Sequence, residues 1–307
     1  EVAQALLDNT PATIDHPELH IVEGRLHLAR ADRLRDGTGE TDQILLGSAI
    51  KSFEAALELN RELGVAWLGL ARTQRLMRNL DEAGESLTRA RRLLGETDSP
   101  CSIEAALLAI DNNDIHAATR YIDAAEIQGS GEAIAYVRGN IAAKSGDYAR
   151  AVAMYTDTLK QNPKHIRARL NRISCYLGLN QALEAKEDAD VLLSLAPDLK
   201  VAIFARGDAL TRVAEWEAAK EDLLVVLEDA PHHYMALTKL AACYLALDRP
   251  ERAEGPINEA LRLAPDFAEA WHQRGLLYLA WEKIETALSD FEAAIRADGN
   301  HLQAREQ

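Results

Sequence analysis

Residues 265–294, PDFAEAWHQRGLLYLAWEKIETALSDFEAA, carry two short apolar helical patterns joined by a polar turn. The proline that opens this stretch recurs every 34 residues, at Pro163, Pro197, Pro231 and Pro265. An alanine keeps the same interval, at Ala151, Ala185, Ala219, Ala253 and Ala287. An interval of 34 residues is the length of a repeat made of two helices and a turn. The sequence therefore predicts an array of repeated helix pairs.

The repeat frame extends over most of the chain. The eight predicted units are 17–63, 64–97, 98–131, 132–165, 166–199, 200–233, 234–267 and 268–301. In the first unit we expect helices at 17–31 and 44–59, with residues 32–43 as an inserted, mobile polar loop. We interpret residues 1–16 as the remnant of a preceding repeat or a capping helix. Residues 302–307 are interpreted as the start of a further repeat or a capping helix.

Small residues recur at positions 8 and 20 of each unit, and larger apolar residues recur at positions 24 and 27. The small ones allow two helices to cross closely, and the larger ones fill the space toward the next unit. The last unit contains Trp271, Gly275, Tyr278, Ala287 and Phe291 in the order and spacing W-x2-L-G-x2-Y…A-x3-F. The sequence thus resembles the tetratricopeptide repeat family over residues 17–301. The resemblance implies an all-α fold, a right-handed α-solenoid of helix–turn–helix repeats.

Charges at positions 7 and 23 of the units predict ion pairs between the two helices of a unit. Arginine at position 7 often accompanies aspartate at position 23, and in unit 98–131 the two signs are exchanged. Such an exchange is expected where two sites touch, because like charges would repel. The predicted pairs are Arg172–Asp188, Arg206–Asp222, Arg274–Asp290 and Glu104–Arg120.

Composition argues against several classes of function. The formal net charge is −15, from 49 acidic and 34 basic side chains, and such a chain would repel the phosphates of a nucleic acid. No apolar run approaches the roughly 18 residues that a membrane-spanning helix needs. Cys101, Cys175 and Cys243 are odd in number and far apart, which favours buried free thiols over disulfides. We expect no nucleic-acid partner, no membrane insertion, and a soluble protein of the cytoplasm or of a bacterial periplasm or cell envelope.

No motif predicts catalysis or a cofactor. Residues 37–39, Gly-Thr-Gly, lack the Lys-Ser/Thr of a phosphate-binding loop. His16, His20 and His27 lack a further ligand in register for a metal. The acidic residues 36–42 lack the order of a calcium-binding loop. We therefore expect no enzyme activity, no metal and no cofactor.

The family resemblance also implies a binding groove formed by the first helix of each unit. Carried onto this sequence, the partner-binding residues are Tyr136, Asn140, Arg167, Leu170, Asn171, Phe204, Asp208, Arg212, Met235 and Lys239. The best-known site of the family, a clamp for the C-terminal carboxylate of chaperones, is matched by Asn140 and Asn171. It lacks its cations here, because Tyr136, Val201 and Ala205 stand where the clamp has basic residues. An alternative is that the apolar members of this set only pack against neighbouring helices.

These observations favour a non-catalytic scaffold that binds a peptide segment or a partner domain in its concave groove. A second possibility is a targeting or regulatory arm of an enzyme or secretion-complex protein whose other domain lies outside these residues. A third is self-association into a larger assembly. The unbroken run of Ala/Leu-rich units is also similar to large bacterial tetratricopeptide proteins of envelope and exopolysaccharide secretion.

Overall fold

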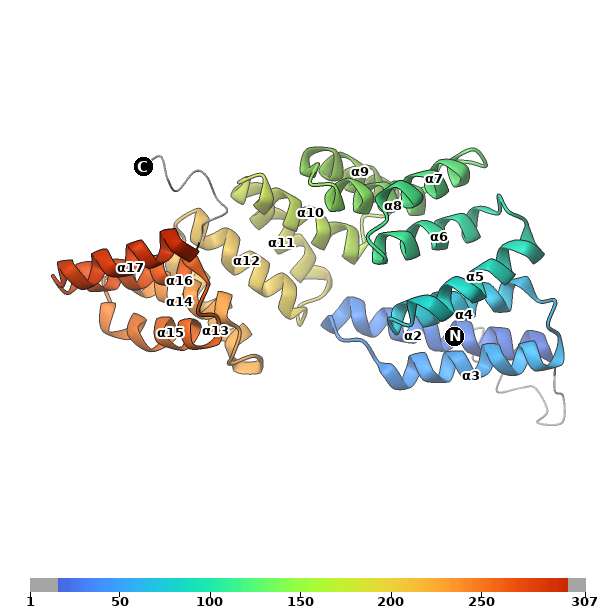
Figure 1. The fold of residues 1–307 in the computed structure, drawn as a ribbon, viewed down its shortest axis with the longest axis horizontal. Coiled ribbons are helices and arrows are strands. Elements are labelled where there is room, and N and C mark those ends of the chain that lie inside the picture. Colours follow the sequence, from blue (N-terminus) through green and yellow to red (C-terminus); the bar gives the residue numbers. More distant parts are fainter. Residues whose placement is uncertain (1–15, 298–307) are drawn as a thin grey trace. The chain divides into compact units, whose positions relative to one another are not determined.

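The computed structural model describes residues 16–297, and every regular element in that range is an α-helix (Figure 1). The predictions for residues 1–15 and 302–307 fall outside it. The chain divides into two compact units, which are described separately: the first contains α2–α10 and the second α11–α17.

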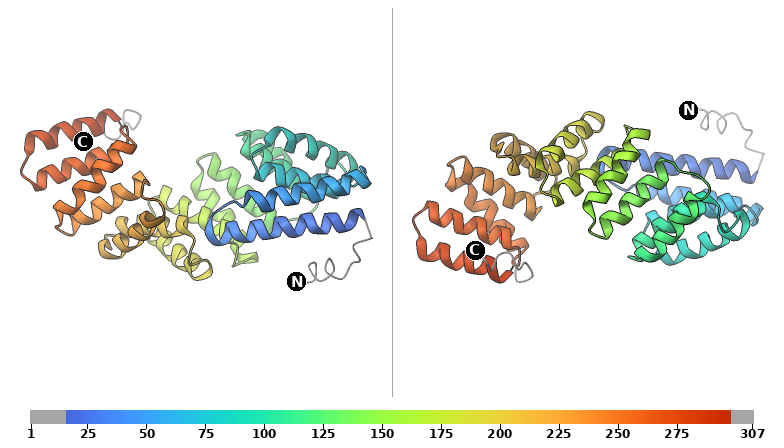
Figure 2. Two further views of the ribbon diagram at one scale, coloured as in Figure 1. Left: turned by 90° about the horizontal axis from the view of Figure 1, so that it is seen from below. Right: turned by 90° about the horizontal axis from the view of Figure 1, so that it is seen from above.

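The first unit is built from helix pairs joined by short turns. Its helices are α2 (Pro17–Thr38), α3 (Gln43–Leu59), α4 (Gly64–Leu76), α5 (Leu80–Leu94), α6 (Ser99–Asp111), α7 (Ile115–Glu126), α8 (Glu132–Lys144), α9 (Tyr148–Gln161) and α10 (Ile166–Gly178). Each pair packs along its length, as α2 and α3 do side by side in Figures 1 and 2. The predicted helical repeat is confirmed.

The second unit continues the same pattern. Its helices are α11 (Ala182–Leu195), α12 (Lys200–Arg212), α13 (Trp216–Asp229), α14 (Tyr234–Ala246), α15 (Pro250–Leu263), α16 (Ala268–Ala280) and α17 (Ile284–Ala297). Each turn within a pair contains one residue with positive φ, such as Ala214 at 62° and Asp248 at 56°. Pro231 and Pro265 lie in the turns that follow α13 and α15.

Small residues at position 8 meet large residues at position 24 of the same unit, whereas we expected position 8 to cross position 20 and position 24 to face the next unit. A Cβ atom on Gly139 of α8 would lie 2.5 Å from Cε1 of Tyr155 on α9. The same added atom on Gly275 of α16 would lie 2.5 Å from Cε1 of Phe291 on α17. Tyr155 is fully buried, so the absence of a side chain at Gly139 is what lets the two helices approach closely.

Residues 32–43 are not the loop that the sequence predicted. Helix α2 continues through them to Thr38 and ends at Gly39, whose φ of 83° suits a glycine at the C-cap. Only residues 39–42 connect α2 to α3, and Asp42 caps α3 by accepting hydrogen bonds from the amides of Ile44 and Leu45. The prediction of a mobile loop was wrong because Asp32 and Asp36 are held by arginines from distant helices.

Two of the four predicted ion pairs are confirmed. Arg206 donates two hydrogen bonds of 2.7 Å to Asp222. Arg274 donates two to Asp290, of 2.7 and 2.9 Å. Asp290 is only 4% exposed, so the pair satisfies a carboxylate that would otherwise be buried without a counter-charge.

The other two predicted pairs have different outcomes. Glu104 is bound by Arg75 of the preceding repeat, with Nε–Oε1 at 2.5 Å, and not by Arg120. The long arginine side chain reaches across to the next unit, so the exchange of signs within one unit did not identify the partner. Arg172 and Asp188 belong to different compact units, and their pairing stays a prediction.

Candidate functional site

The first helices of the repeats in the first unit surround a cavity of about 700 Å³. Its walls come from α2, α4, α6 and α8, and Arg167 at the start of α10 completes it. Its apolar lining consists of Leu28, Phe53, Val65, Leu68, Leu76, Ile103, Leu107 and Val137. A cavity of this size is in the range that holds a small ligand or a few side chains of a peptide. We call it the inner cavity.

Arginines dominate the charged part of the inner cavity. Five line it, namely Arg25, Arg35, Arg72, Arg75 and Arg167. The only carboxylates in the lining are those of Glu104 and Glu132. The lining of the inner cavity is therefore rich in guanidinium groups, most of which are paired with Glu104 or with aspartates just outside the lining.

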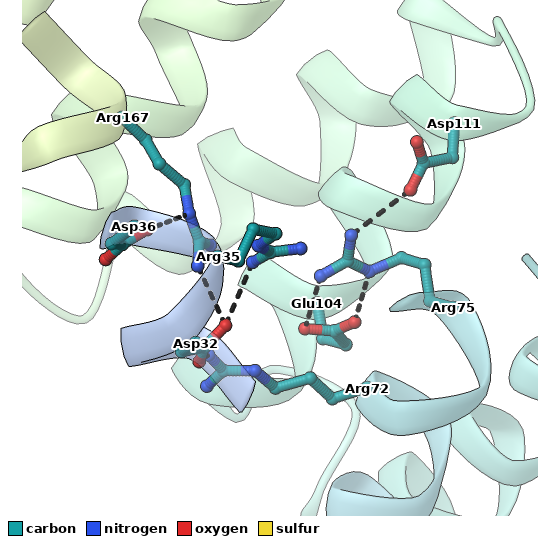
Figure 3. A network of polar contacts seen from close by, with 8 residues as sticks. All are labelled: Asp32, Arg35, Asp36, Arg72, Arg75, Glu104, Asp111 and Arg167. Atoms are coloured by element: carbon teal, nitrogen blue, oxygen red, sulfur yellow. Dashed lines mark hydrogen bonds and ion pairs between the residues drawn. The ribbon is translucent and has the colours of Figure 1, made fainter. Parts of the chain in front are cut away.

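Three of these arginines bind the same carboxylate, that of Asp32 at the end of α2 (Figure 3). Asp32 lies 2.9 Å from Arg35, 2.6 Å from Arg72 and 2.8 Å from Arg167. Asp36, one turn further along α2, accepts a second bond of 2.8 Å from Nε of Arg167. Burial acts to raise the pKa of Asp32, but the charges of Arg72, Arg167 and Arg35 outweigh it and the pKa is lowered. Asp32 is thus held as an anion.

The arginines in this network are not equally neutralised. Burial acts to lower the pKa of Arg75, but Glu104 and Asp111 outweigh it and the pKa is raised. Arg75 donates hydrogen bonds to both carboxylates. By contrast, burial and the neighbouring charge of Arg167 lower the pKa of Arg35. The Nε of Arg35 is buried and has no hydrogen-bond partner among the described residues. Arg35 is therefore only partly satisfied by Asp32.

Two of the predicted partner-binding residues lie in the inner cavity. Tyr136 lines it from α8, with its ring centroid 4.7 Å from that of His165. Arg167 also lines it, but its guanidinium already binds Asp32 and Asp36. Leu170, one turn after Arg167 on α10, is half-buried.

Asn140 and Asn171 line a second cavity of the first unit, of about 410 Å³. The side-chain amide of Asn171 donates to Oδ1 of Asn140 at 3.0 Å, and the hydroxyl of Tyr155 donates to the same oxygen at 2.8 Å. The remaining lining residues are Ile110, Ala143, Lys144, Tyr148, Ser174 and Cys175. Because Tyr136 and Asn140 are one turn apart on α8, the two cavities open along the same helix. We call this second one the amide cavity.

The predicted residues of the second unit bind mainly one another. Asp208 is 8% exposed and lies 3.2 Å from Arg212 and 2.8 Å from Lys239. Lys239 also reaches Glu269 at 3.3 Å. The ring centroids of Phe204 and His233 are 4.6 Å apart, and Met235 is half-buried. These charged groups have structural partners, and whether they also meet a ligand is untested.

Most of the arginines that line the inner cavity were not predicted from the sequence. Arg72 and Arg75 come from α4, and Asp32 and Arg35 come from the part of α2 that was predicted to be a loop. One signal was available: the run ARADRLRD at 29–36 places Asp32, Arg35 and Asp36 at helical spacing. Their partner Arg167, however, lies more than 130 residues away, beyond the reach of a local pattern.

The described part of the chain offers neither a metal site nor a membrane-spanning helix. Between residues 16 and 297 no three His, Cys, Asp or Glu side chains are placed to hold a metal ion. Within the same range, no helix combines the length and the apolar character needed to cross a bilayer. Cys101, Cys175 and Cys243 are buried free thiols.

Family models of the tetratricopeptide repeat match three stretches of the chain. The stretches are residues 142–202, 204–268 and 268–301, which together cover just over half of the sequence. The chain belongs to the tetratricopeptide repeat family. The match at 268–301 coincides with the last predicted unit, and the other unit boundaries stay a prediction.

Relatives of known name match parts of this tetratricopeptide array. Hsp70-Hsp90 organizing protein 2 of Arabidopsis thaliana is 29% identical over 172 residues, which is 54% of this chain and 29% of that protein. Protein FlbA of Caulobacter vibrioides is 30% identical over 159 residues, 51% of this chain and 26% of that protein. The match thus spans less than a third of each of these relatives.

Solved structures share the fold across nearly the whole chain. A crystal structure of the APC/C hetero-tetramer Cut9-Hcn1 matches 99% of this chain and 57% of its own, with a TM-score of 0.69 and 12% identity. A human IFIT1 dimer with m7Gppp-AAAA matches 96% of this chain and 75% of its own, with a TM-score of 0.63 and 15% identity. At these identities the likeness concerns the fold alone.

Proposed function

We propose that the protein is a non-catalytic interaction scaffold whose first unit holds a segment of a partner protein. The observation that carries this proposal is the pair of cavities along α8. The inner cavity contains Tyr136, and the amide cavity contains Asn140 and Asn171. Apolar walls can take side-chain anchors, and amides can hydrogen-bond the backbone of an extended segment.

Membership of the tetratricopeptide family supports a protein partner. The first of the relatives described above is named as an organiser of Hsp70 and Hsp90, which are themselves proteins. The chaperone-tail clamp is not the mode we propose for this chain. Tyr136, Val201 and Ala205 stand at its basic positions, and a terminal carboxylate without cations would be desolvated at a cost.

A retention experiment tests the proposal. The chain is immobilised, exposed to an extract of its source organism, and the retained proteins are identified by mass spectrometry. We expect the double variant Tyr136→Ala, Asn171→Ala to lose the retained partner while its circular dichroism stays that of the wild type. Asn171→Ala removes one amide but leaves Oδ1 of Asn140 bonded to the hydroxyl of Tyr155, so the local fold is preserved.

Ile127→Ala is the matched control. Ile127 follows α7, is 88% exposed and lines neither cavity. We expect this variant to retain the partner at full strength. Equal retention by the double variant and the control would place the binding surface elsewhere and contradict the proposal.

A further inference from the structure

We infer that the inner cavity receives an acidic peptide segment through its side-chain carboxylates, in competition with Asp32 and Asp36 at the end of α2. This inference rests on the proposed function and names the chemistry of the segment. The site differs from the chaperone-tail clamp, because its cations come from α2, α4 and the start of α10.

The charge of the lining favours carboxylates. Five arginines line the cavity, and the carboxylates that pair with them include Asp32 and Asp36 at the end of α2, which an incoming carboxylate could replace. The planar guanidinium group binds carboxylates with paired hydrogen bonds and is easier to desolvate than an ammonium group. The apolar lining adds a preference for aliphatic side chains beside the acidic ones. A segment that alternates acidic and aliphatic residues would satisfy both parts of the lining.

Two arginines of the inner cavity, Arg25 and Arg35, are not fully paired, although carboxylates of the chain bind the others. The single carboxylate of Asp32 is shared by Arg35, Arg72 and Arg167. The Nε of Arg35 is buried and has no partner within residues 16–297. No ion pair of Arg25 is present within that range either. A further carboxylate entering the cavity would therefore gain charge-assisted hydrogen bonds that the chain alone does not supply.

The end of α2 is held in place by charge and hardly by packing. The last buried residue of α2 is Ala31, and none of the residues from 32 to 38 is buried. Asp36 is 36% exposed, and Leu34 is 37% exposed. Each ion pair of partly exposed side chains contributes only modestly to stability, although the three pairs of Asp32 add up. An incoming carboxylate can therefore replace those of Asp32 and Asp36 without unfolding the core of the first unit.

Fluorescence anisotropy with a defined peptide tests the inference. The probe is a 12-residue peptide of alternating Asp and Leu, labelled at its N-terminus and amidated at its C-terminus so that only side-chain carboxylates are present. The control peptide has Asn at every Asp position. We expect the wild-type chain to bind the acidic peptide and not to bind the Asn peptide.

Three variants identify the competing groups. Asp32→Asn with Asp36→Asn should bind the acidic peptide about tenfold more tightly, because the internal competitor is removed while all five arginines remain. Arg72→Gln with Arg167→Gln should lower the affinity by at least about tenfold. Arg92→Gln with Arg120→Gln, two exposed arginines that line neither cavity, should leave it unchanged.

Circular dichroism melts accompany each variant. If the double aspartate variant does not fold, Asp36→Asn alone removes one of the two carboxylates on Arg167, and we expect about a two- to threefold gain in affinity. An unchanged or weaker affinity in a folded aspartate variant would contradict the competition.

Other results would overturn the inference in different ways. Equal binding of the Asn peptide would show that carboxylates are not recognised. A 12-nucleotide oligoadenylate that binds more tightly than the acidic peptide, and displaces it, would assign the cavity to nucleic acid. Binding only of a peptide with a free C-terminus would assign it to terminal carboxylates. If the arginine pair variant keeps the partner of the retention experiment, the inference fails while the proposed function stands.

Discussion

Arg167 and Asp32 are 135 residues apart in the sequence, and their side chains meet at 2.8 Å between the last and the first helix of the first unit. In a solenoid each repeat contacts mainly its neighbours. This pair instead joins α10 to α2, the first helices of two repeats that are not adjacent. An ion pair therefore bridges the inner surface of the first unit.

Removing the shared carboxylate should destabilise the first unit. Asp32→Asn leaves Arg35, Arg72 and Arg167 without their common anion, and hydrogen bonds to charged groups contribute about 1.5–3 kcal/mol each at most. Because the site is partly exposed, we expect a loss of about 1–3 kcal/mol in the free energy of unfolding. Denaturant titration followed by circular dichroism measures it.

Asp157→Asn is the control for that experiment. Asp157 pairs with Lys160 within α9, and both side chains are about half exposed or more, so the loss should be below about 1 kcal/mol. Salt gives a second check: the difference between wild type and Asp32→Asn should shrink at 1 M salt because screening weakens the pairs. A difference that is unaffected by salt would mean that Asp32 stabilises α2 by packing.

Adding a methyl group at Gly139 should also destabilise the first unit. The new Cβ would lie 2.5 Å from Tyr155, so either the ring or the helix must move, and overpacking costs about 1–3 kcal/mol. Gly47 lies inside α3 with nothing within 4 Å of an added Cβ. Gly47→Ala should instead stabilise the chain by about 0.5–1 kcal/mol through helix propensity. Thermal melts of the two variants should therefore shift in opposite directions.

The repeating part of the fold could be read from the sequence because it is local. The 34-residue interval fixes where each helix pair starts, and small residues such as Gly139 show where two helices cross closely. The same interval predicted Arg206–Asp222 and Arg274–Asp290, since both members of each pair lie in one unit. Tyr136 lines the inner cavity, and its role in binding a partner stays a prediction.

The features that depend on distant contacts were missed. Residues 36–39, Asp-Gly-Thr-Gly, have the composition of a turn, yet α2 runs through most of them. Local propensity is a weak preference that tertiary contacts can override, and here Arg167 and Arg72 bind the carboxylates of α2. Glu104 was assigned to Arg120 for a similar reason: its partner Arg75 lies 29 residues earlier, in the preceding repeat.

The three thiols should be unreactive in the folded chain. Burial raises the pKa of Cys175 to about 11, although this residue lines the amide cavity, and it is 2% exposed. Burial also raises the pKa of Cys101 to about 12 and that of Cys243 to about 11. Because the thiolate is the reactive form, we expect no reaction with a thiol reagent at pH 8 until denaturant is added. Rapid labelling of one thiol in the native state would reveal local opening at that helix pair.

His165 should make stability depend on pH near neutrality. It caps α10 through Nδ1, which accepts a hydrogen bond from the amide of Ala168 at 3.1 Å and can do so only while that nitrogen is unprotonated. Burial lowers the pKa of His165 below its ordinary value of 6.5, and the charge of Arg167 acts in the same direction. Glu132, 3.6 Å from Nε2, and Asp36 oppose the shift without reversing it.

The sign of the pH effect follows from which state takes up the proton. As the pH falls through 6.5, the unfolded chain protonates this histidine before the folded chain does, so the free energy of unfolding decreases. The contribution is fully present above the unfolded-state pKa and is lost as the pH falls toward the folded-state value. His165→Asn keeps a side chain that can cap the helix but does not titrate. Denaturant titrations at pH 7.5 and pH 5.5 should therefore give a smaller loss of stability for His165→Asn than for the wild type. Equal losses in the two proteins would mean that another group carries the pH dependence.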